Sequence, residues 1–343
     1  MIRMKEFSII INGHPVGPGH PTYVIAEVGS NHNQQLEMAL RYIDEFARAG
    51  ANAVKFQVFS ADTLVNPVLR PDFHKIIHEY SIPREWLPIL STRAKDQGVD
   101  LIATPFDHEA VQVLQAVGVP AFKIASSDLT NWPLLKTVAA TSKPIILSTG
   151  LAYLGEIETA VRSLRIMGVR EVAVLHCIGA YPTVEKDVNL RVIPLLQQML
   201  KVPVGFSDHT LGLGASVASV ALGACIIEKH VTFDRKQEGP DHSFALELDE
   251  FRLMVKLIRQ AEDALGEDVK RLVQDEVEDR ERARRGIYAR NKIPAGTQIM
   301  EEMLVTLRPC RGIGAEMWEN LIGRVARKDI QPYEPLSWLM FEE

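Results

Sequence analysis

The stretch Ala53-Val54-Lys55-Phe56-Gln57-Val58 is an apolar run of strand length that carries two polar side chains at alternate positions. Side chains of a β-strand point to opposite faces with a period of two. Lys55 and Gln57 therefore share one face, and the larger apolar side chains share the other. The apolar face can pack under helices, whereas a buried lysine needs a partner. The stretch predicts a strand of a helix-covered sheet whose second face is polar.

Seven further apolar stretches of this chain end in a hydroxyl, amine, carboxylate or imidazole group. Together the eight ends lie at residues 26–29, 54–57, 103–106, 122–126, 146–150, 175–177, 206–209 and 228–230. Segments with helical spacing of apolar residues separate them, as at residues 36–49. Eight strand-then-helix units predict an α/β fold, a (β/α)8 TIM barrel, with a doubly wound sheet as the alternative. A barrel collects all eight ends at one mouth, where catalytic residues gather.

The pattern changes after about residue 265. Residues 266–283 are dense in charged side chains, and residues 284–343 hold short strand-like pieces at 286–290, 304–308, 323–326 and 330–336. We therefore expect a catalytic barrel at 1–265, a solvated helical linker at 266–283 and a small mostly-β domain at 284–343. A domain of about 60 residues buries little surface alone, so we expect it to lean on the barrel or on a neighbouring subunit.

The composition is that of an ordinary globular protein. Of the 343 residues, 46% are hydrophobic and 24% are charged, and the formal net charge is −6. This charge favours neither nucleic acid nor a membrane surface as a partner. No apolar run is long enough to span a bilayer, and no signal-peptide core follows the basic first residues. We expect a cytoplasmic protein, with Cys177 and Cys225 as buried, inert thiols.

Two histidines give the strongest local signal. Ser207-Asp208-His209 ends the seventh predicted strand and Glu228-Lys229-His230 ends the eighth, so both imidazoles can reach one point above the barrel. Two imidazole ligands suit zinc, manganese or iron and leave positions open for water and substrate. Asp208 would then hold His209 in position. The alternative is a pair of hydrogen-bonded histidines at the rim.

Lys55 and Lys123 indicate an anion site inside the barrel. A bound phosphate or carboxylate could pair with these lysines, and so could Glu27. Nearby hydroxyl groups could donate to phosphate oxygens, namely those of Ser126, Ser148, Thr149 and Ser207. Internal salt bridges are the structural alternative, and a Schiff-base lysine is the chemical one.

Three loops are expected at the mouth. Asp241 lies in the turn Gly239-Pro240-Asp241-His242, where it could orient a sugar hydroxyl, hold a metal-bound water or cap the turn. We expect His242 at the surface. Tyr181 could donate a proton or serve as a rigid wall, and His32 could pack in its loop or act as a ligand.

Taken in order, these motifs resemble those of the sialic acid synthases, the phosphoenolpyruvate-dependent nonulosonate synthases that include N-acetylneuraminate, legionaminate and pseudaminate synthases. The matching stretches are residues 25–33, 54–57, 122–128, 146–150, 206–210, 227–230 and 239–241. The similarity covers essentially the whole chain. The C-terminal part resembles the SAF domain of this family, also called antifreeze-like.

The resemblance implies an enzyme that condenses phosphoenolpyruvate with an N-acyl amino sugar, N-acetylmannosamine in first place, and releases phosphate. His209 and His230 would bind a divalent metal, with Mn²⁺ first and Mg²⁺ or Co²⁺ as alternatives. Catalytic roles fall to Glu27, Tyr181 and Asp241. The substrate-binding set is Lys55, Gln57, Thr104, Lys123, Ser126, Asp128, Ser148, Ser207, Glu228 and Arg308. Arg308 would act in trans, in a domain-swapped homodimer.

Three departures from the family pattern leave the acceptor sugar open. Asp128 stands where some relatives have glutamate, Gly179 stands where some have a polar contact, and Cys310 replaces a frequent glycine. A legionaminate or pseudaminate synthase acting on a diacetamido-trideoxyhexose is therefore an alternative, as is a metal-dependent aldolase or a 3-deoxy-heptulosonate-type enzyme. The lysines, Glu27 and the histidines argue against a non-enzymatic sugar- or ice-binding protein.

Overall fold

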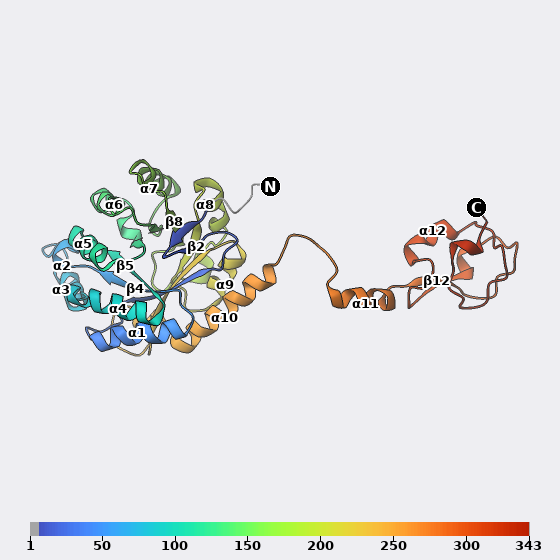
Figure 1. Cartoon of the computed structure of the whole chain (residues 1–343), viewed down its shortest axis with the longest axis horizontal. Coiled ribbons are helices and arrows are strands. Elements are labelled where there is room, and N and C mark those ends of the chain that lie inside the picture. Colours follow the sequence, from blue (N-terminus) through green and yellow to red (C-terminus); the bar gives the residue numbers. More distant parts are fainter. Residues whose placement is uncertain (1–6, 343) are drawn as a thin grey trace. The chain divides into compact units, whose positions relative to one another are not determined.

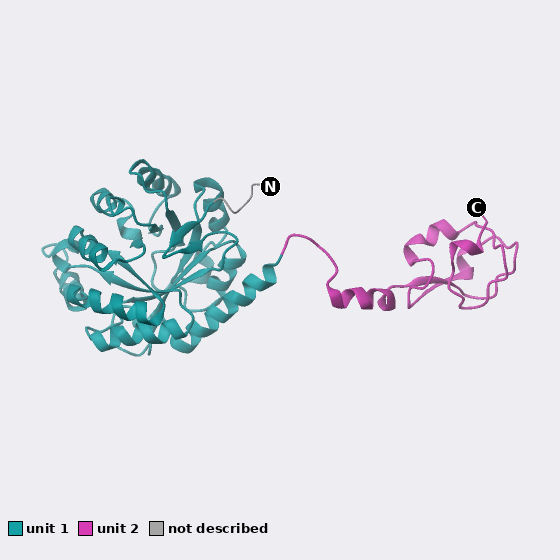
Figure 2. Ribbon diagram, in the orientation of Figure 1, with its two compact units in different colours: residues 1–266 teal, residues 267–343 magenta. Residues whose placement is uncertain are grey.

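The computed structural model describes residues 7–342. Contacts within the chain divide it into two units, the first ending at Gly266 and the second beginning at Glu267 (Figure 2). Each unit has its own apolar core. Within the described residues, no helix is both long enough and apolar enough to span a membrane.

The first unit is a closed barrel of parallel strands. Its strands are β3 (Tyr23–Gly29), β4 (Ala53–Val58), β5 (Asp100–Pro105), β6 (Phe122–Ile124), β7 (Ile145–Ser148), β8 (Val172–Cys177), β9 (Val204–Asp208) and β10 (Ile226–Thr232). Neighbouring strands pair in chain order, and β10 pairs with both β9 and β3. This closure confirms the TIM barrel and excludes the doubly wound sheet. A short strand, β11 (Leu246–Glu247), pairs with the end of β10.

Helices surround the barrel (Figure 1). They are α1 (Leu36–Arg48), α4 (Leu87–Gln97), α5 (His108–Val117), α6 (Trp132–Ala139), α7 (Leu154–Ile166), α8 (Val192–Leu200), α9 (Gly214–Ala221) and α10 (Leu248–Leu265). Local signals set their ends. The Asp107 side chain accepts the Ala110 N–H at 2.7 Å to begin α5, and Gly118, with φ of +80°, ends it.

Strand alternation separates two apolar clusters. Val54 and Phe56 of β4 pack outward against the helices, in the larger cluster. Ala53 faces inward, with Ile25, Ile102 and the first inward side chains of other strands. These inward residues lie at the amino ends of their strands and fill the floor of the barrel. The inward-facing polar side chains of β4, Lys55 and Gln57, lie above this floor, toward the carboxyl end of the strand.

A hairpin that we did not predict closes this floor. It consists of β1 (Ile9–Ile11) and β2 (His14–Val16), which pair antiparallel. Ile9, Ile11 and Val16 are buried in the same cluster as the inward side chains of the barrel floor.

Short helices occupy several of the remaining connections. The insert between β4 and α4 forms α2 (Ala61–Leu64), α3 (Pro71–Tyr80) and η2 (Arg84–Trp86). Further single turns at the carboxyl side of the barrel are η3 (Ser126–Asp128), η4 (Glu185–Asp187) and η5 (His242–Phe244).

The first helix of the second unit is α11 (Gln274–Ala283), which has no buried residue. The elements that follow are β12 (Gly286–Ala289), η6 (Glu301–Met303), β13 (Leu304–Leu307), η7 (Ala315–Met317), α12 (Trp318–Leu321) and η8 (Trp338–Met340). β12 and β13 pair antiparallel. The pieces expected as strands at 323–326 and 330–336 form isolated bridges instead, such as Ile293 with Ile330. The short bridges suit a small, irregular β unit.

Candidate active site

A pocket of about 270 Å³ lies at the carboxyl ends of the barrel strands. Most of the predicted site residues line it, namely Glu27, Lys55, Gln57, Thr104, Lys123, Ser126, Ser148, Tyr181, Ser207, His209, Glu228 and His230. A larger hollow of about 360 Å³ lies beside the amino end of β5. There the Asp100 carboxylate accepts hydrogen bonds from Asn12 and Tyr23. Because these polar groups satisfy one another, the pocket at the mouth is the better candidate.

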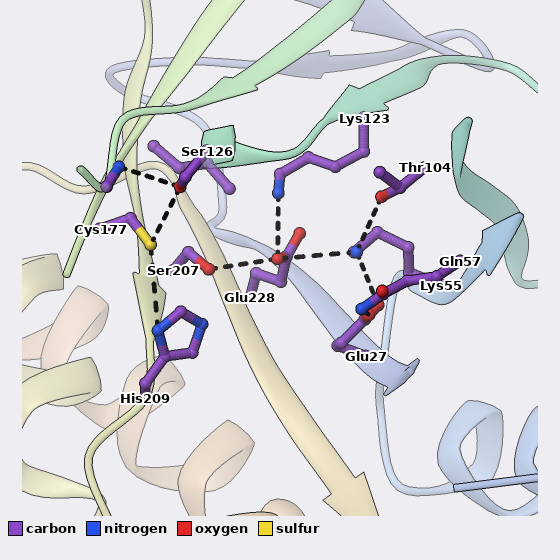
Figure 3. A network of polar contacts seen from close by, with 12 residues as sticks. Glu27, Lys55, Gln57, Thr104, Lys123, Ser126, Cys177, Ser207, His209 and Glu228 are labelled. Atoms are coloured by element: carbon purple, nitrogen blue, oxygen red, sulfur yellow. Dashed lines mark hydrogen bonds and ion pairs between the residues drawn. The ribbon is translucent and has the colours of Figure 1, made fainter. Parts of the chain in front are cut away.

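Lys55 lies at the centre of one buried ion-pair network (Figure 3). Its Nζ is 2.7 Å from Oε2 of Glu27 and donates to Oγ1 of Thr104 at 3.1 Å. The Gln57 amide donates to the other Glu27 oxygen at 2.6 Å. Burial alone would lower the pKa of Lys55, but the carboxylates of Glu228 and Glu27 outweigh it and raise this pKa. Lys55 is therefore a permanent cation in the pocket wall.

Glu228 links the two lysines. Its Oε1 lies 3.2 Å from Nζ of Lys123 and 3.8 Å from Nζ of Lys55, and it accepts from the Ser207 hydroxyl at 3.2 Å. Burial would raise the pKa of Glu228, but Lys123 and Lys55 overcome this and hold the pKa at about 2. Burial lowers the pKa of Lys123 against the attraction of Glu228. The lysines thus form the internal salt bridges that the sequence left as an alternative.

Polar atoms in this network still lack partners. Oε2 of Glu228 and the Ser148 hydroxyl are buried and have no hydrogen-bond partner among residues 7–342. Ser126 Oγ accepts the Gly150 N–H at 2.9 Å and donates its own proton only to the Cys177 sulfur, a weak acceptor, at 3.6 Å. An unmade hydrogen bond at a buried atom costs free energy, so these atoms suit a polar ligand.

The two histidines face each other across the pocket, with ring centroids 5.6 Å apart. Nδ1 of His209 lies 2.8 Å from the Ile178 carbonyl, so it carries the proton and leaves Nε2 as an acceptor. Burial, and after it the neighbouring His230, lower the pKa of His209 to about 4. Nδ1 of His230 is buried without a partner among the described residues. A neutral His209 beside an unbonded His230 nitrogen is a donor set that metal ions use.

Aromatic rings enclose the histidine pair. The Tyr181 ring lies 4.0 Å from the His209 ring, and the Phe244 ring lies 5.0 Å from that of His230, measured between centroids. Partial burial and then the Cys177 and Glu228 side chains raise the pKa of Tyr181. Its phenol therefore stays neutral, able to donate a hydrogen bond but unsuited to act as a base.

The structure does not bring all predicted residues into the pocket. The Asp128 carboxylate accepts from Asn131 and Ser127 in its own turn, and it does not line the pocket. Asp241 accepts from the N–H and hydroxyl of Ser30 at 2.9 and 2.8 Å, which ties two mouth loops together. Arg308 belongs to the second unit, immediately after β13.

Contrary to our expectation, the Asp208 carboxylate does not bond to the His209 ring; Nδ1 of that ring meets the Ile178 carbonyl instead. Because strand side chains alternate, the Asp208 carboxylate points away from the pocket and pairs with Lys229 at 2.9 Å.

His242 is not at the surface either. Its ring is fully buried, with Nδ1 2.7 Å from the Thr232 hydroxyl and Nε2 3.1 Å from Oδ1 of Asn33. His32 is also buried and packs edge-on against Trp86, so loop packing describes it better than ligation.

Sequence reasoning missed several pocket residues. Phe106, Leu151 and Cys177 line the pocket, and Phe244 packs beside it. Cys177 is buried as expected, but its sulfur lies 3.6 Å from Ser126 Oγ and 3.9 Å from Nδ1 of His209. Alternation along β8 could have placed Cys177 in the pocket, because His176, the residue before it, points outward to the Val188 carbonyl.

Comparisons with known proteins place this chain in one family. Residues 42–270 match the NeuB family and residues 284–342 match the SAF domain. The N,N'-diacetyllegionaminic acid synthase of Campylobacter jejuni is 36% identical, over 91% of this chain and 98% of its own length. A pseudaminic acid synthase of the same species is 34% identical, over 90% of this chain and 93% of its own.

A solved structure supports the same assignment. The N-acetylneuraminic acid synthetase of Leptospira borgpetersenii is 34% identical, with a TM-score of 0.76, and the match covers 80% of this chain and 95% of that one. The matched families also follow one another in the order of the two units. This chain therefore belongs to the NeuB family and is an enzyme of the synthase class.

Proposed function

We propose that this enzyme condenses phosphoenolpyruvate with the open-chain form of an N-acyl amino sugar and water, giving a sialic-acid-type nonulosonate and phosphate. One observation carries the proposal: a buried pair of lysines and an unpartnered serine hydroxyl share one pocket with two imidazoles. The first group suits a small phosphorylated carboxylate, and the second suits an ion that binds an aldehyde oxygen.

Phosphoenolpyruvate fits the lysine side of the pocket. Lys55 and Lys123 can face its carboxylate and phosphate, and serine hydroxyls can donate to the phosphate oxygens. The candidates for those hydroxyl contacts are Ser126, Ser148 and Ser207, with Thr104 beside Lys55. Preorganised, buried cations stabilise the charge that develops as phosphate leaves.

The histidine pair would hold a divalent ion. No group of three or more His, Cys, Asp or Glu side chains with metal-ligand geometry occurs in residues 7–342, so the protein offers two ligands here. Because Nδ1 of His209 bonds to the Ile178 carbonyl, its Nε2 is left with a lone pair, and a neutral ring of this kind can bind a metal ion. We propose Mn²⁺ first, with Mg²⁺ or Co²⁺ as alternatives. Such an ion, when bound, supplies polarisation of the acceptor's carbonyl group.

Glu27 is our candidate for acid–base work. Lys55 and Gln57 hold its two oxygens, which fixes a carboxylate at the edge of the pocket. C3 of phosphoenolpyruvate forms the new bond to the aldehyde carbon while the carbonyl π bond breaks, and the aldehyde oxygen takes up a proton to become a hydroxyl. A water oxygen then adds at C2. Glu27 takes the proton of that water, and the C2–oxygen bond to phosphate then breaks. Tyr181 is the second candidate, as a donor, and Asp241 would orient the sugar from the loop that Ser30 holds.

The acceptor is proposed as N-acetylmannosamine. The diacetamido-trideoxyhexoses of legionaminate and pseudaminate synthesis are the alternative, and relatives of similar identity support them equally. Both acceptor classes present an aldehyde and an N-acyl group, so the reaction proposed above does not depend on the choice.

We further propose a cytoplasmic, domain-swapped homodimer in which Arg308 of one subunit serves the pocket of the other. Apolar side chains near the pocket support a covering partner. Leu151, which lines the pocket, is 78% exposed, and Tyr153 in the same loop is 85% exposed. Exposed apolar side chains gathered at one site mark an interaction surface.

The test is phosphate release from phosphoenolpyruvate with Mn²⁺ present, across a panel of acceptors. The panel holds N-acetylmannosamine, the two diacetamido-trideoxyhexoses, erythrose 4-phosphate and a blank without sugar. Release with one amino sugar supports the proposal and identifies the acceptor. Release with erythrose 4-phosphate alone, or none at all from folded, metal-loaded protein, overturns it. His209→Ala and His230→Ala should each abolish release, and a fully active double variant would contradict the metal assignment.

A further inference from the structure

A buried ion pair lies directly behind the two imidazoles. Asp208 precedes His209 at the end of β9, and Lys229 precedes His230 in β10. The two are cross-strand partners, with Nζ of Lys229 2.9 Å from Oδ2 of Asp208. Their side chains are 1% and 0% exposed, and neither lines the pocket. Neither side chain can therefore contact a substrate in the pocket.

Lys229 also ties down the chain that follows His209. Its Nζ donates to the Thr210 carbonyl at 2.5 Å and to the Gly212 carbonyl at 3.2 Å. The Thr210 N–H in turn donates to Oδ1 of Asp208 at 2.8 Å. The residues on both sides of His209 are thus bonded to the residue that precedes His230.

These bonds lie where the strand ladder stops. The β9–β10 pairing runs through Ile227 with Phe206 and ends at Lys229 with Asp208. His209 and His230 lie one residue beyond that end. His230 is still paired with Glu27 of β3 on its other side, whereas His209 has no ladder partner on β10. The Thr183 N–H and the Ile178 carbonyl hold His209 from the β8 side, at 2.9 and 2.8 Å. Beyond the ladder, the bonds of Asp208 and Lys229 join the two strands that carry the histidines.

Stability alone does not explain the pair. Removing a lysine and an aspartate from water costs about as much as their attraction returns, and apolar residues of similar volume often serve as well. What such a pair can do is fix the positions of the backbone segments to which it is bonded. Residues behind metal ligands commonly fix the orientation of those ligands.

We propose that Asp208 and Lys229 are positioning residues that set the spacing of the His209 and His230 imidazoles, and thereby the affinity for the divalent ion. This inference rests on the metal site of the proposed function. It assigns the pair no contact with substrate and no part in proton transfer.

The test uses the full-length protein and two variants. The double variant Asp208→Asn/Lys229→Met removes both charges, so neither is left buried and alone. Asp208→Glu keeps the ion pair but lengthens the carboxylate arm by one methylene. Mn²⁺ binding to metal-free protein is measured by titration calorimetry, and the visible spectrum of Co²⁺-loaded protein reports the geometry of the ligands.

Both variants should bind Mn²⁺ about 10- to 100-fold more weakly than the wild type, as for other residues behind metal ligands. The Co²⁺ spectrum should shift. The KM for phosphoenolpyruvate at saturating metal should stay within about twofold of the wild-type value, because neither residue lines the substrate pocket. A merely structural role would lower the melting temperature without changing the spectrum of the folded protein.

A matched control is the ion pair between Arg235 and Glu250, which follows β10 but touches neither flank of His209. Arg235→Met/Glu250→Gln should keep wild-type Mn²⁺ affinity. Wild-type Mn²⁺ affinity in either Asp208 variant overturns the inference and leaves the proposed function standing. Absence of Mn²⁺ binding by the wild-type protein itself overturns the metal assignment and the inference with it.

Discussion

At the scale of single residues, the two pocket lysines have unequal surroundings. Lys55 contacts Glu27 at 2.7 Å and Glu228 at 3.8 Å, whereas Lys123 contacts Glu228 alone among the described carboxylates. Their pKa values move in opposite directions, upward for Lys55 and downward for Lys123. The sequence could show that both lysines point inward, but it could not show how the carboxylates divide between them.

The unequal pairing predicts unequal stability of two methionine variants. Lys55→Met leaves the Glu27 carboxylate buried without its cation, so the free energy of unfolding should fall by about 3 kcal/mol. Lys123→Met should cost less, because Glu228 retains Lys55. Urea titration at pH 7 measures both. Equal losses, or a larger loss for Lys123→Met, would contradict the pairing.

His32 predicts a pH dependence of stability. Burial lowers the pKa of His32 from 6.5 to about 4, against the attraction of Asp241. The unfolded chain therefore binds a proton at His32 below pH 6.5, and the folded protein does not until about pH 4. The contribution of His32 to the free energy of unfolding is therefore complete above pH 6.5 and is lost as the pH falls from 6.5 toward 4. At pH 4.5 the loss is about 2 kcal/mol.

The measurement compares the wild type with His32→Gln, whose side chain can still accept the Gln34 N–H. Other groups titrate in both proteins, so the difference between their urea midpoints isolates His32. We expect the wild type to lose more stability than the variant between pH 7 and pH 4.5. Parallel pH profiles would contradict the prediction, because they would show that folding does not lower the pKa of this ring.

At the scale of elements, β9 depends on a residue without a side chain. A Cβ at Gly205 would overlap the Ile226 carbonyl oxygen and lie 2.7 Å from Cδ2 of Leu175. The Ile226 carbonyl is backbone of the adjacent strand β10, so it cannot shift without disturbing the β9–β10 ladder. Gly205→Ala should lower the free energy of unfolding by about 2 kcal/mol. Gly212→Ala is the control, since nothing lies within 4 Å of its Cβ position. Equal urea midpoints for the two variants would contradict this account.

The sequence predicted the barrel elements because their signal is periodic. Alternation along β4 placed Lys55 and Gln57 inward, and the structure agrees. The β1–β2 hairpin was missed although Asn12-Gly13, both with positive φ, is a strong signal for a two-residue turn. Its strands of three residues are too short to show alternation.

The loops at the mouth could be predicted least. The burial of His242 depends on Thr232 and on Asn33, which lies 209 residues away in sequence. The pairing of Asp208 with Lys229 likewise joins two strands through side chains on their outward faces. Neither contact has a local pattern, because each depends on how separate elements come together in the closed barrel.

At the scale of the whole molecule, the two units differ in what they contain. The pocket, the lysines and the histidines belong to the first unit, and Arg308 belongs to the second. Each unit has a separate apolar core, so a substitution in one should leave the fold of the other intact. Two variant proteins can therefore be made, one with a substitution in the first unit and one with a substitution in the second, and each should still fold.

Mixing two inactive variants tests the proposed exchange between subunits. Arg308→Ala removes the contribution of the second unit, and Lys123→Ala disables the pocket of the first. In a swapped dimer, a mixed pair holds one pocket with intact Lys123 and, from its partner, an intact Arg308. Random assembly makes half of the dimers mixed, so about a quarter of wild-type phosphate release should return when the chains are unfolded and refolded together. If Arg308 serves its own chain, every pocket keeps one defect, and the mixture stays as inactive as its components.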